Sequence, residues 1–413
     1  MFPSRVRPKT FAALTTAAAL VAGGAVTYAA RADNDGPRAR SVIFINGDGM
    51  GPAQREAARL TYKGFDGRLT MDSLPVSGQL TTSPDDPVSA ITDSAAGATA
   101  WTIGKRTYNG AISVDVHKKP WRTLGEQAKD DGKSTGLVTT AQVTDASPAA
   151  WFANEASRKD EDDIARQYLE VSKPDVILGG GEDWWLPSSN PGAFPDGDGE
   201  RSKGTKGNLI AQARRDGYRY VSSAADLRAA PDDGKLLGLF ANEEMFQQRE
   251  EGKGDVYDPV VPLADMTSKA LDVLQNDKDG FFLFVEEEAI DEFSHHNNAT
   301  RMLQAMGELD KAVAVAKAYA AKHPDTLVVV TGDHECGGLT VEDNSKTDES
   351  GSGVSREDGP FPIAHSPRRF SLDWTTTGHT GVDVPVTATG PLSSMFTGKH
   401  PNTHVHEVLA KAL

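Results

Sequence analysis

The sequence is poor in cysteine and in positive charge, and both shortages restrict what the protein can be. Its 413 residues include one cysteine, Cys336, so no disulfide forms within the chain, and stability must come from the core and from metals. Lysine and arginine number 43 against 59 aspartates and glutamates, which leaves a net charge of −16. This balance disfavours nucleic acid and anionic membranes as main partners. An acidic protein that handles an anionic substrate needs local positive charge, which metal ions supply.

The N-terminus has the parts of a secretory signal peptide. Three basic residues precede an apolar run over residues 11–30, and an A-x-A triplet, Ala30-Arg31-Ala32, ends the segment. The alternative is a retained membrane anchor, but the threonine and glycine content of the run is poor for a span. We therefore predict export, to the periplasm or outside the cell, with a signal peptide over residues 1–32 and no stable membrane span after processing.

Apolar runs alternate with helical patterns along the rest of the chain, as in an α/β protein. The length allows one large domain or two smaller ones. Buried strands are predicted over residues 41–45, 134–140, 174–178, 280–285 and 327–330, and helices over 52–62, 263–275 and 302–321. Segments rich in glycine, serine, proline or charge predict flexible insertions near residues 187–207 and 344–358.

Residues 92–100 read T-D-S-A-A-G-A-T-A, a run of small side chains that predicts a closely packed helix. Either Thr92 or Asp93 suits the N-cap, which places Ser94 at the helix N-terminus, where negative charge is favoured. A serine held there beside a metal or a base is a candidate nucleophile. The alternative is a capped, tightly packed helix with no chemical role.

Acidic and hydroxyl residues follow two of the predicted strands. Asp48 stands in a glycine-rich turn after residues 41–45, and the alternative is a turn-forming aspartate. Asp145 and Ser147 follow residues 134–140, where either side chain also suits a helix cap. A helix from about Pro148 is expected to carry Arg158, whose planar fork suits two phosphate oxygens.

Histidines and acids also follow the later strands. Residues 286–296 hold a dense group of acids and two histidines directly after a very apolar strand, which is costly unless a cation neutralises them. Asp291 and His295 stand four residues apart, so both face one side of a helical turn and suit a metal; the alternative is a solvated loop. Asp333 and His334 follow residues 327–330. His379 lies between glycines, where a backbone approaches closely, although a lone histidine is more often structural.

These residues converge if the sheet is mostly parallel, because the carboxyl ends of parallel strands share one edge. Mixed nitrogen and oxygen ligands suit zinc, and sets of oxygen ligands suit magnesium. A serine beside two such ions favours phosphoryl transfer, in which two metals hold the attacking and leaving oxygens.

Six motifs in this order resemble those of the bacterial alkaline phosphatases. They are G-D-G-M-G at residues 47–51, T-D-S-A-A-G-A-T-A at 92–100, D-A-S-P-A-A at 145–150, V-E-x-x-x-I-D-x-x-x-H at 285–295, D-H at 333–334 and G-H-T-G at 378–381. Each motif is weak alone, but six in register are specific. The resemblance implies a three-layer α/β/α sandwich around a large, mostly parallel sheet, with residues 33–413 as a single domain.

The resemblance also implies roles for individual residues. Ser94 matches the nucleophile that becomes a phosphoserine, Arg158 the arginine that binds phosphate, and Asp93 the acid that orients this arginine. The implied cofactors are two Zn²⁺ and one Mg²⁺ per chain. The ligand sets are Asp291, His295 and His379 for one zinc, Asp48, Asp333 and His334 for the other, and Asp48, Ser147 and Glu286 for magnesium, with Asp145 behind the last through water.

The chain departs from the family pattern at several positions. Ser147 stands where threonine is frequent, and its hydroxyl keeps the role. Glu292 stands where lysine often contacts phosphate through water, so we expect weaker product binding and faster release. Glu287 and Glu288 replace smaller residues, so the register of Glu286 rests on its distance from Asp291.

The expected function is that of a secreted, metal-dependent hydrolase of small-molecule phosphate monoesters, with broad specificity and best activity at alkaline pH. One alternative is a phosphodiesterase or sulfatase on the same metal scaffold. Another is an extracellular metal- or phosphate-binding protein without turnover. Relatives are often dimers, so a homodimer is expected by resemblance, although the sequence shows no interface signature.

Overall fold

The computed structural model describes residues 38–194, 201–246, 257–344 and 356–413. The predicted signal peptide lies outside the described residues, as do residues 195–200 and 345–355 of the two predicted insertions. The described flanks of the first insertion are joined by a β-bridge between Pro187 and Gly204. Residues 356–358, at the end of the second insertion, begin strand β11 (Arg356–Pro362). None of the helices in these ranges has the length and apolarity needed to span a bilayer.

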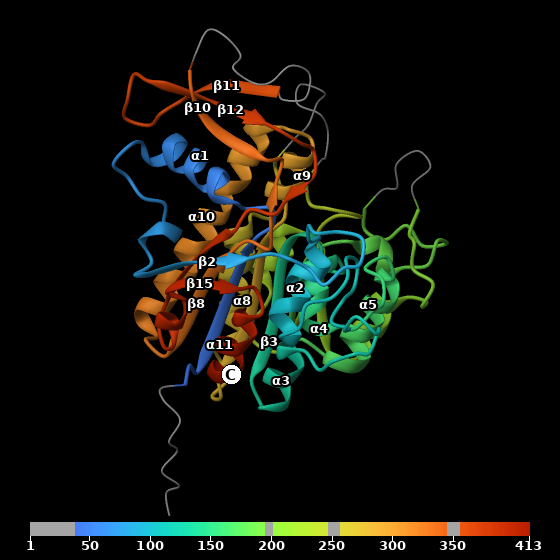
Figure 1. Cartoon of the computed structure of the whole chain (residues 1–413). Helices are drawn as coiled ribbons and strands as arrows, with labels where there is room; N and C mark the ends of the chain where they lie inside the picture. Colours follow the sequence, from blue (N-terminus) through green and yellow to red (C-terminus); the bar gives the residue numbers. More distant parts are fainter. Residues whose placement is uncertain (1–37, 195–200, 247–256, 345–355) are drawn as a thin grey trace, which may run out of the picture. The chain divides into compact units, whose positions relative to one another are not determined.

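A ten-stranded sheet forms the centre of the fold (Figure 1). Neighbouring strands from β8 through to β5 are parallel, whereas β14 runs antiparallel to both of its neighbours. The predicted large, mostly parallel sheet is therefore confirmed. The order across the sheet is β15 (Gly398–Pro401), β2 (Val76–Thr81), β14 (Val384–Thr389), β8 (Thr326–Thr331), β1 (Ser41–Gly47), β7 (Phe281–Glu287), β3 (Ser134–Gln142), β4 (Val176–Gly180), β6 (Lys235–Leu239) and β5 (Tyr218–Val221).

Helices cover both faces of this sheet, because successive side chains of a buried strand point to opposite faces. In β1, Ile43 and Ile45 join one core, while Val42 and Phe44 join the other. The three-layer sandwich expected from the sequence is thus confirmed (Figure 1). The first core includes residues of α1 (Pro52–Lys63), α7 (Ala224–Ala229), α8 (Leu263–Leu274), α9 (Ala289–His295) and α10 (Ala299–Lys322), and the second includes residues of α2 (Ser94–Ile103), α3 (Leu124–Asp130), α4 (Ala146–Phe152), α5 (Glu161–Gln167), α6 (Leu209–Arg215) and α11 (His404–Ala412).

Two smaller sheets follow β8 in the chain. One contains β10 (Leu339–Asp343), β12 (Arg369–Trp374) and β11 in that order. The other pairs β9 (Glu335–Cys336) with β13 (His379–Thr380), so that His379 lies opposite Cys336. Short helical turns complete the described elements at Met71–Ser73, Tyr168–Ser172, Glu182–Trp185 and Ser393–Phe396.

The helix predicted from about Pro148 is shorter than expected, and this prediction was wrong for Arg158. α4 ends at Phe152, and Ala153 already has an extended backbone. The side chain of Asn154 donates hydrogen bonds to the carbonyl oxygens of Ser113 and Trp121. The backbone N–H of Arg158 donates to Gly110. These tertiary hydrogen bonds replace helical ones, so Arg158 lies in a loop that is tied to another part of the chain.

Candidate active site

The candidate residues meet at the carboxyl edge of the central sheet. Asp48 directly follows β1, Asp333 follows β8, and Glu286 lies near the end of β7. Because β1 lies between β7 and β8, its Asn46 is in register with both Glu286 and Thr331. The parallel register therefore places these acids side by side, as the sequence pattern predicted.

Ser94 is the first residue of α2, and its hydroxyl points to one of the predicted ligands. Asp93 is the N-cap, and its carboxylate accepts the N–H of Ala96 at 2.9 Å. The hydroxyl oxygen of Ser94 lies 3.2 Å from Nε2 of His334. A Cβ added at Gly97 would stand 3.3 Å from the Cβ of Asp333, so only a small residue allows this approach. The small side chains of α2 thus bring Ser94 against the metal ligands.

Asp48, Asp333 and His334 form the first ligand cluster. Their ligand atoms all lie within 4.8 Å of one another. Nε2 of His334 is 3.1 Å from Oδ2 of Asp333 and 3.5 Å from Oδ1 of Asp48. Because the same nitrogen faces the Ser94 hydroxyl, a cation bound here would contact the serine.

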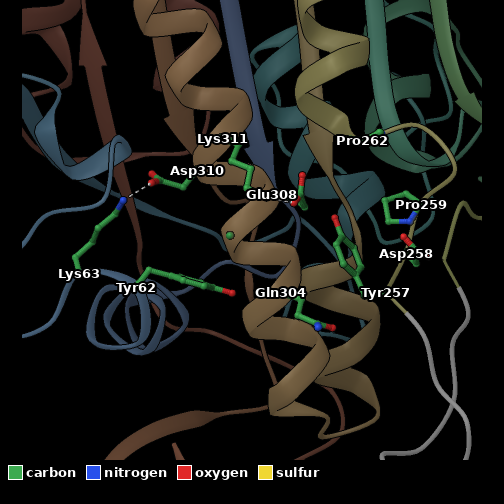
Figure 2. A pocket seen from close by; sticks show the side chains of 11 residues that line it. Tyr62, Lys63, Tyr257, Asp258, Pro259, Pro262, Gln304, Glu308, Asp310 and Lys311 are labelled. Carbon is green, nitrogen blue, oxygen red and sulfur yellow. Dashed lines mark hydrogen bonds and ion pairs between the residues drawn. The ribbon is translucent and has the colours of Figure 1, made fainter. Parts of the chain in front are cut away.

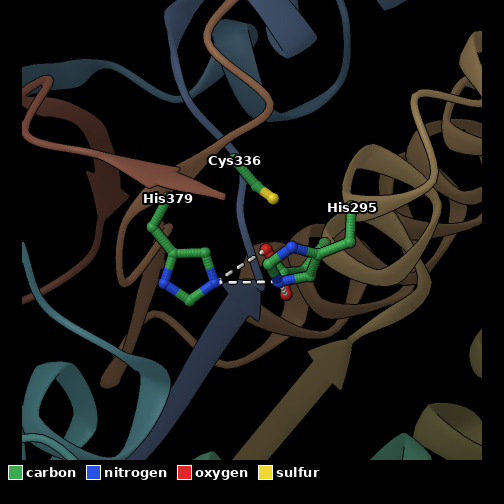
Figure 3. Close-up of side chains that lie close together, drawn as sticks. His295, Cys336 and His379 are labelled. Carbon is green, nitrogen blue, oxygen red and sulfur yellow. Dashed lines mark hydrogen bonds and ion pairs between the residues drawn. The ribbon is translucent and has the colours of Figure 1, made fainter. Parts of the chain in front are cut away.

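Asp291, His295 and His379 form the second ligand cluster (Figure 3). The two histidine Nε2 atoms are 3.0 Å apart, and they lie 3.0 Å (His295) and 3.5 Å (His379) from the Asp291 carboxylate. Nδ1 of His295 bonds the carbonyl of Thr377, and Nδ1 of His379 bonds that of Thr92. A carbonyl oxygen only accepts, so each Nδ1 carries a proton, and Nε2 of each ring binds a metal once the ring is neutral.

Cys336 is a site residue that the sequence did not predict. Its sulfur belongs to the same group of converging ligand atoms as Asp291, His295 and His379, and Figure 3 shows it pointing toward the two rings. The side chain is fully buried. The sequence offered one signal for Cys336, which is its position two residues after the predicted ligand His334. Its approach to His379, however, depends on the pairing of β9 with β13.

Both clusters fit metal ions. Buried oxygen atoms of Asp48, Asp291 and Asp333 have no hydrogen-bond partner. Unpaired carboxylate oxygens in a buried site are costly unless a cation meets them. Burial and the charges of the neighbouring acids, Asp333 first among them, raise the pKa of Asp48 well above its usual value. The same crowding favours a bound cation over a proton once the pH is high enough.

The third predicted ligand set is made of oxygen atoms. The hydroxyl of Ser147 donates to Oδ2 of Asp48 at 3.3 Å. Glu286 accepts hydrogen bonds from Asn46 at 3.1 Å and from Thr139 at 2.7 Å. Burial raises the pKa of Glu286 to about 8. Sequence reasoning missed Asn46 and Thr139, which position Glu286 from the two neighbouring strands.

Arg158 is held beside the Ser94 helix by two acids. Nη2 of its guanidinium group lies 2.7 Å from Oδ1 of Asp145, and Nη1 lies 3.6 Å from Oδ2 of Asp93. The resemblance assigned its orientation to Asp93, but Asp145 makes the closer ion pair. Asp93 also accepts the N–H of Gly110 at 2.8 Å, and the carbonyl of Gly110 accepts the N–H of Arg158. Asp93 therefore fixes both the helix start and the loop that carries the arginine.

Glu287 and Glu292, which both follow Glu286 in the chain, lie in different surroundings. Glu287 accepts hydrogen bonds from Thr140 at 2.8 Å and from Tyr257 at 2.6 Å. Tyr257 lines a separate cavity of about 460 Å³ beside α10, which contains none of the predicted ligands (Figure 2). Glu292, by contrast, lies next to Asp291 on α9, and burial together with the Asp291 charge raises its pKa to about 7.

Metal binding at the second ligand cluster is expected to strengthen as the pH rises, because His295 holds a proton in the metal-free protein. Burial disfavours the charged ring, but the hydrogen bond and charge of Asp291 outweigh it and raise the pKa of His295 to about 9. A divalent metal ion must displace this proton, so its affinity is expected to rise about tenfold per pH unit between about pH 6 and 8. Competition with a fluorescent zinc chelator measures this slope, and His295→Gln should flatten it. A wild-type affinity that stays constant across this range would contradict the assignment.

Comparisons with known proteins agree over nearly the whole chain. A family model described as alkaline phosphatase matches residues 39–364 and 363–413. Alkaline phosphatase 3 of Bacillus subtilis is 32% identical, covering 100% of this chain and 97% of its own length. The streptomycin-6-phosphate phosphatase of Streptomyces griseus is 36% identical, covering 95% and 94%. The crystal structure of a cold-active alkaline phosphatase from Shewanella sp. matches with a TM-score of 0.74 and 30% identity, covering 90% of this chain and 100% of that chain.

Proposed function

Since the chain belongs to the alkaline phosphatase family, and is thus a hydrolase of phosphate monoesters, we propose that it works through a phosphoserine on Ser94. One observation carries the proposal: the Ser94 hydroxyl lies 3.2 Å from His334, within a ligand cluster that contains unpaired buried carboxylate oxygens. A serine so placed is a nucleophile that a bound cation activates.

The ligand chemistry supports two zinc ions and one magnesium ion. The two mixed nitrogen and oxygen clusters suit zinc, and the oxygen set of Asp48, Ser147 and Glu286 suits magnesium. Bound there, the ions would supply the positive charge that stabilises the serine alkoxide and the leaving oxygen.

The residues of the chain then have distinct tasks. Ser94 attacks phosphorus, so that the bond from its oxygen to phosphorus forms while the ester bond breaks and the alcohol leaves. The Arg158 fork holds two non-bridging phosphate oxygens, and Asp145 and Asp93 keep it in place. Attack of water on the phosphoserine releases phosphate and restores the hydroxyl.

Arg158 favours monoesters over diesters, because a monoester has three terminal oxygens and can place two on the fork and one on the metal clusters, whereas a diester has only two. Arg158→Ala is expected to lower kcat/KM for p-nitrophenyl phosphate about a hundredfold, since charged hydrogen bonds to phosphate are lost. Turnover of bis-p-nitrophenyl phosphate should change far less. Arg166→Ala, which removes a surface ion pair with Asp163, is the matched control. A wild-type rate higher on the diester than on the monoester would reverse the assignment in favour of a phosphodiesterase.

We also propose broad specificity, export and a homodimer. Similarity to a relative named only as an alkaline phosphatase, with no particular ester in its name, supports the first, whereas the Streptomyces griseus relative is named for one ester. The pattern of residues 1–32 supports export. Mass analysis of the protein recovered outside the cytoplasm tests this proposal. Family resemblance supports the homodimer, and light scattering tests it.

The alternative of a binding protein is tested by the same assay as the main proposal, because bound metal without phosphate release from any ester would establish it.

A further inference from the structure

The loop that leads into α2 carries three groups of the active site. Ser94 supplies the proposed nucleophile, and Asp93 caps the helix and faces Arg158. The carbonyl of Thr92 accepts the hydrogen bond of Nδ1 of His379, at 2.9 Å. A shift of this short segment would therefore displace the nucleophile, the phosphate-binding arginine and a metal ligand together.

No helix or strand holds this loop in place, since residues 82–93 lie between the end of β2 and the start of α2. Its backbone groups need side-chain partners instead. Asn109 supplies two such contacts: its Nδ2 donates to the carbonyl of Ile91 at 2.9 Å, and its Oδ1 accepts the N–H of Asp93 at 3.1 Å. An amide offers both the donor and the acceptor that this arrangement requires. Asn109 thus holds the chain on both sides of Thr92.

The same loop holds Asn109 in return. The backbone N–H of Asn109 donates to Oδ2 of Asp86 at 2.8 Å. Oδ1 of Asp86 accepts the N–H groups of Val88 at 2.8 Å and Ser89 at 3.0 Å. Asp86 therefore shapes the loop before α2 and also fixes the turn after this helix, so the Asn109 amide keeps its position relative to Ile91.

Gly110 extends this link to Arg158. Its N–H donates to Oδ2 of Asp93 at 2.8 Å, and its carbonyl accepts the N–H of Arg158 at 2.7 Å. Its φ of 85° lies in the left-handed region, which glycine adopts without steric cost. Asn109 and Gly110 therefore join the segment of the nucleophile to the loop of the arginine.

We propose that Asn109 is a positioning residue of the phosphatase, which sets the place of Ser94 and, through Thr92, the orientation of the His379 ring. It acts through the backbone of its neighbours rather than by contact with the substrate. The inference rests on the proposed function, because the place of Ser94 matters only if its hydroxyl attacks phosphorus. Groups that orient metal-binding histidines contribute about tenfold to a hundredfold to metal affinity. A displacement of about 1 Å at the reacting groups costs up to about a hundredfold in rate.

Two substitutions remove this contact in different ways. Asn109→Ala deletes both hydrogen bonds, whereas Asn109→Asp keeps the shape of the side chain and turns an oxygen, instead of an N–H donor, toward the carbonyl of Ile91. At saturating zinc and magnesium, both variants are expected to lower kcat for p-nitrophenyl phosphate about tenfold to a hundredfold. Competition with a fluorescent chelator should show one zinc per chain bound about tenfold more weakly, because the Thr92 carbonyl holds a ligand of the second cluster.

Asn276→Ala is the matched control. Asn276 is an exposed residue between α8 and β7, and its amide donates to the carbonyls of Asp232, Asp272 and Val273. The substitution removes hydrogen bonds to the backbone, as in Asn109→Ala, but at the opposite end of β7 from the ligands. The kcat and the zinc affinity should stay within about twofold of the wild type. The unfolding temperature of each variant shows whether it is folded under the assay conditions.

Two results would overturn the inference. The first is a folded Asn109→Ala or Asn109→Asp protein whose kcat and zinc affinity stay within about twofold of the wild type; Asn109→Asp decides if Asn109→Ala does not fold. The second is an equal loss of both quantities in Asn276→Ala, because the effect would then be a general loss of stability. Failure of the proposed function looks different, because the wild type would then hydrolyse none of the phosphate monoesters or would carry no phosphoryl group on Ser94 during turnover.

Discussion

Ser94→Ala is expected to lower kcat for p-nitrophenyl phosphate by at least about a thousandfold, because the variant lacks the oxygen that attacks phosphorus. Metal content and thermal stability should change little. Ser94 lies at the start of α2 but does not cap it; Asp93 does, through its bond to Ala96. The helix therefore keeps its N-terminal hydrogen bond in the variant.

Ser73→Ala is the matched control. Ser73 is exposed and far from the ligand clusters in the sequence, and its hydroxyl donates to the carbonyl of Thr70. Its removal should leave turnover within about twofold of the wild type, as is usual for exposed positions without a special role. Full activity of Ser94→Ala with its metals in place would refute the nucleophile assignment.

Removal of the metals is expected to abolish activity and also to lower stability. Without bound cations, the buried carboxylates of Asp48, Asp333 and Asp291 face one another and retain unpaired oxygens. We expect a loss of kcat of at least about a thousandfold after dialysis against a chelator, and recovery when zinc and magnesium are added back together. The unfolding temperature should rise with added zinc, because a ligand that binds only the folded state stabilises it.

Variants at one ligand separate a specific site from general metal binding. Asp291→Asn should lose about one zinc per chain and most of the activity, because this carboxylate lies within reach of both histidines of its cluster. His117→Ala, at an exposed histidine outside both clusters, should lose neither. Unchanged activity after complete removal of zinc and magnesium would contradict the role of these clusters.

The sequence predicted the central strands and most ligands because each depends on local pattern. The runs at β1, β7 and β8 are apolar enough to be buried on both faces, and their ends carry the acids directly. The pattern therefore brought Asp48, Asp333 and Glu286 to one edge of the sheet, and the resemblance to the family gave their ligand roles. The outer strands β5, β6, β2, β14 and β15 were not predicted, because they are short or mixed in polarity.

Other features depend on contacts between distant segments, which a local pattern does not contain. Arg158 leaves its helix because Asn154 binds carbonyl groups of another loop. Cys336 joins the second ligand cluster only through the pairing of β9 with β13. Burial together with the neighbouring Asp291 charge raises the pKa of Glu292 to about 7, and the family pattern alone does not contain this burial.

The central claim is that hydrolysis passes through a phosphoserine on Ser94, and trapping that species tests it most directly. The metal-loaded protein is incubated with p-nitrophenyl phosphate, quenched in acid and digested, and the peptides are analysed by mass spectrometry. We predict one added phosphoryl group on the peptide that contains Ser94, absent from Ser94→Ala and from protein that was not given substrate. Rapid turnover with no phosphoryl group on Ser94, or with the group on another residue, would contradict the account.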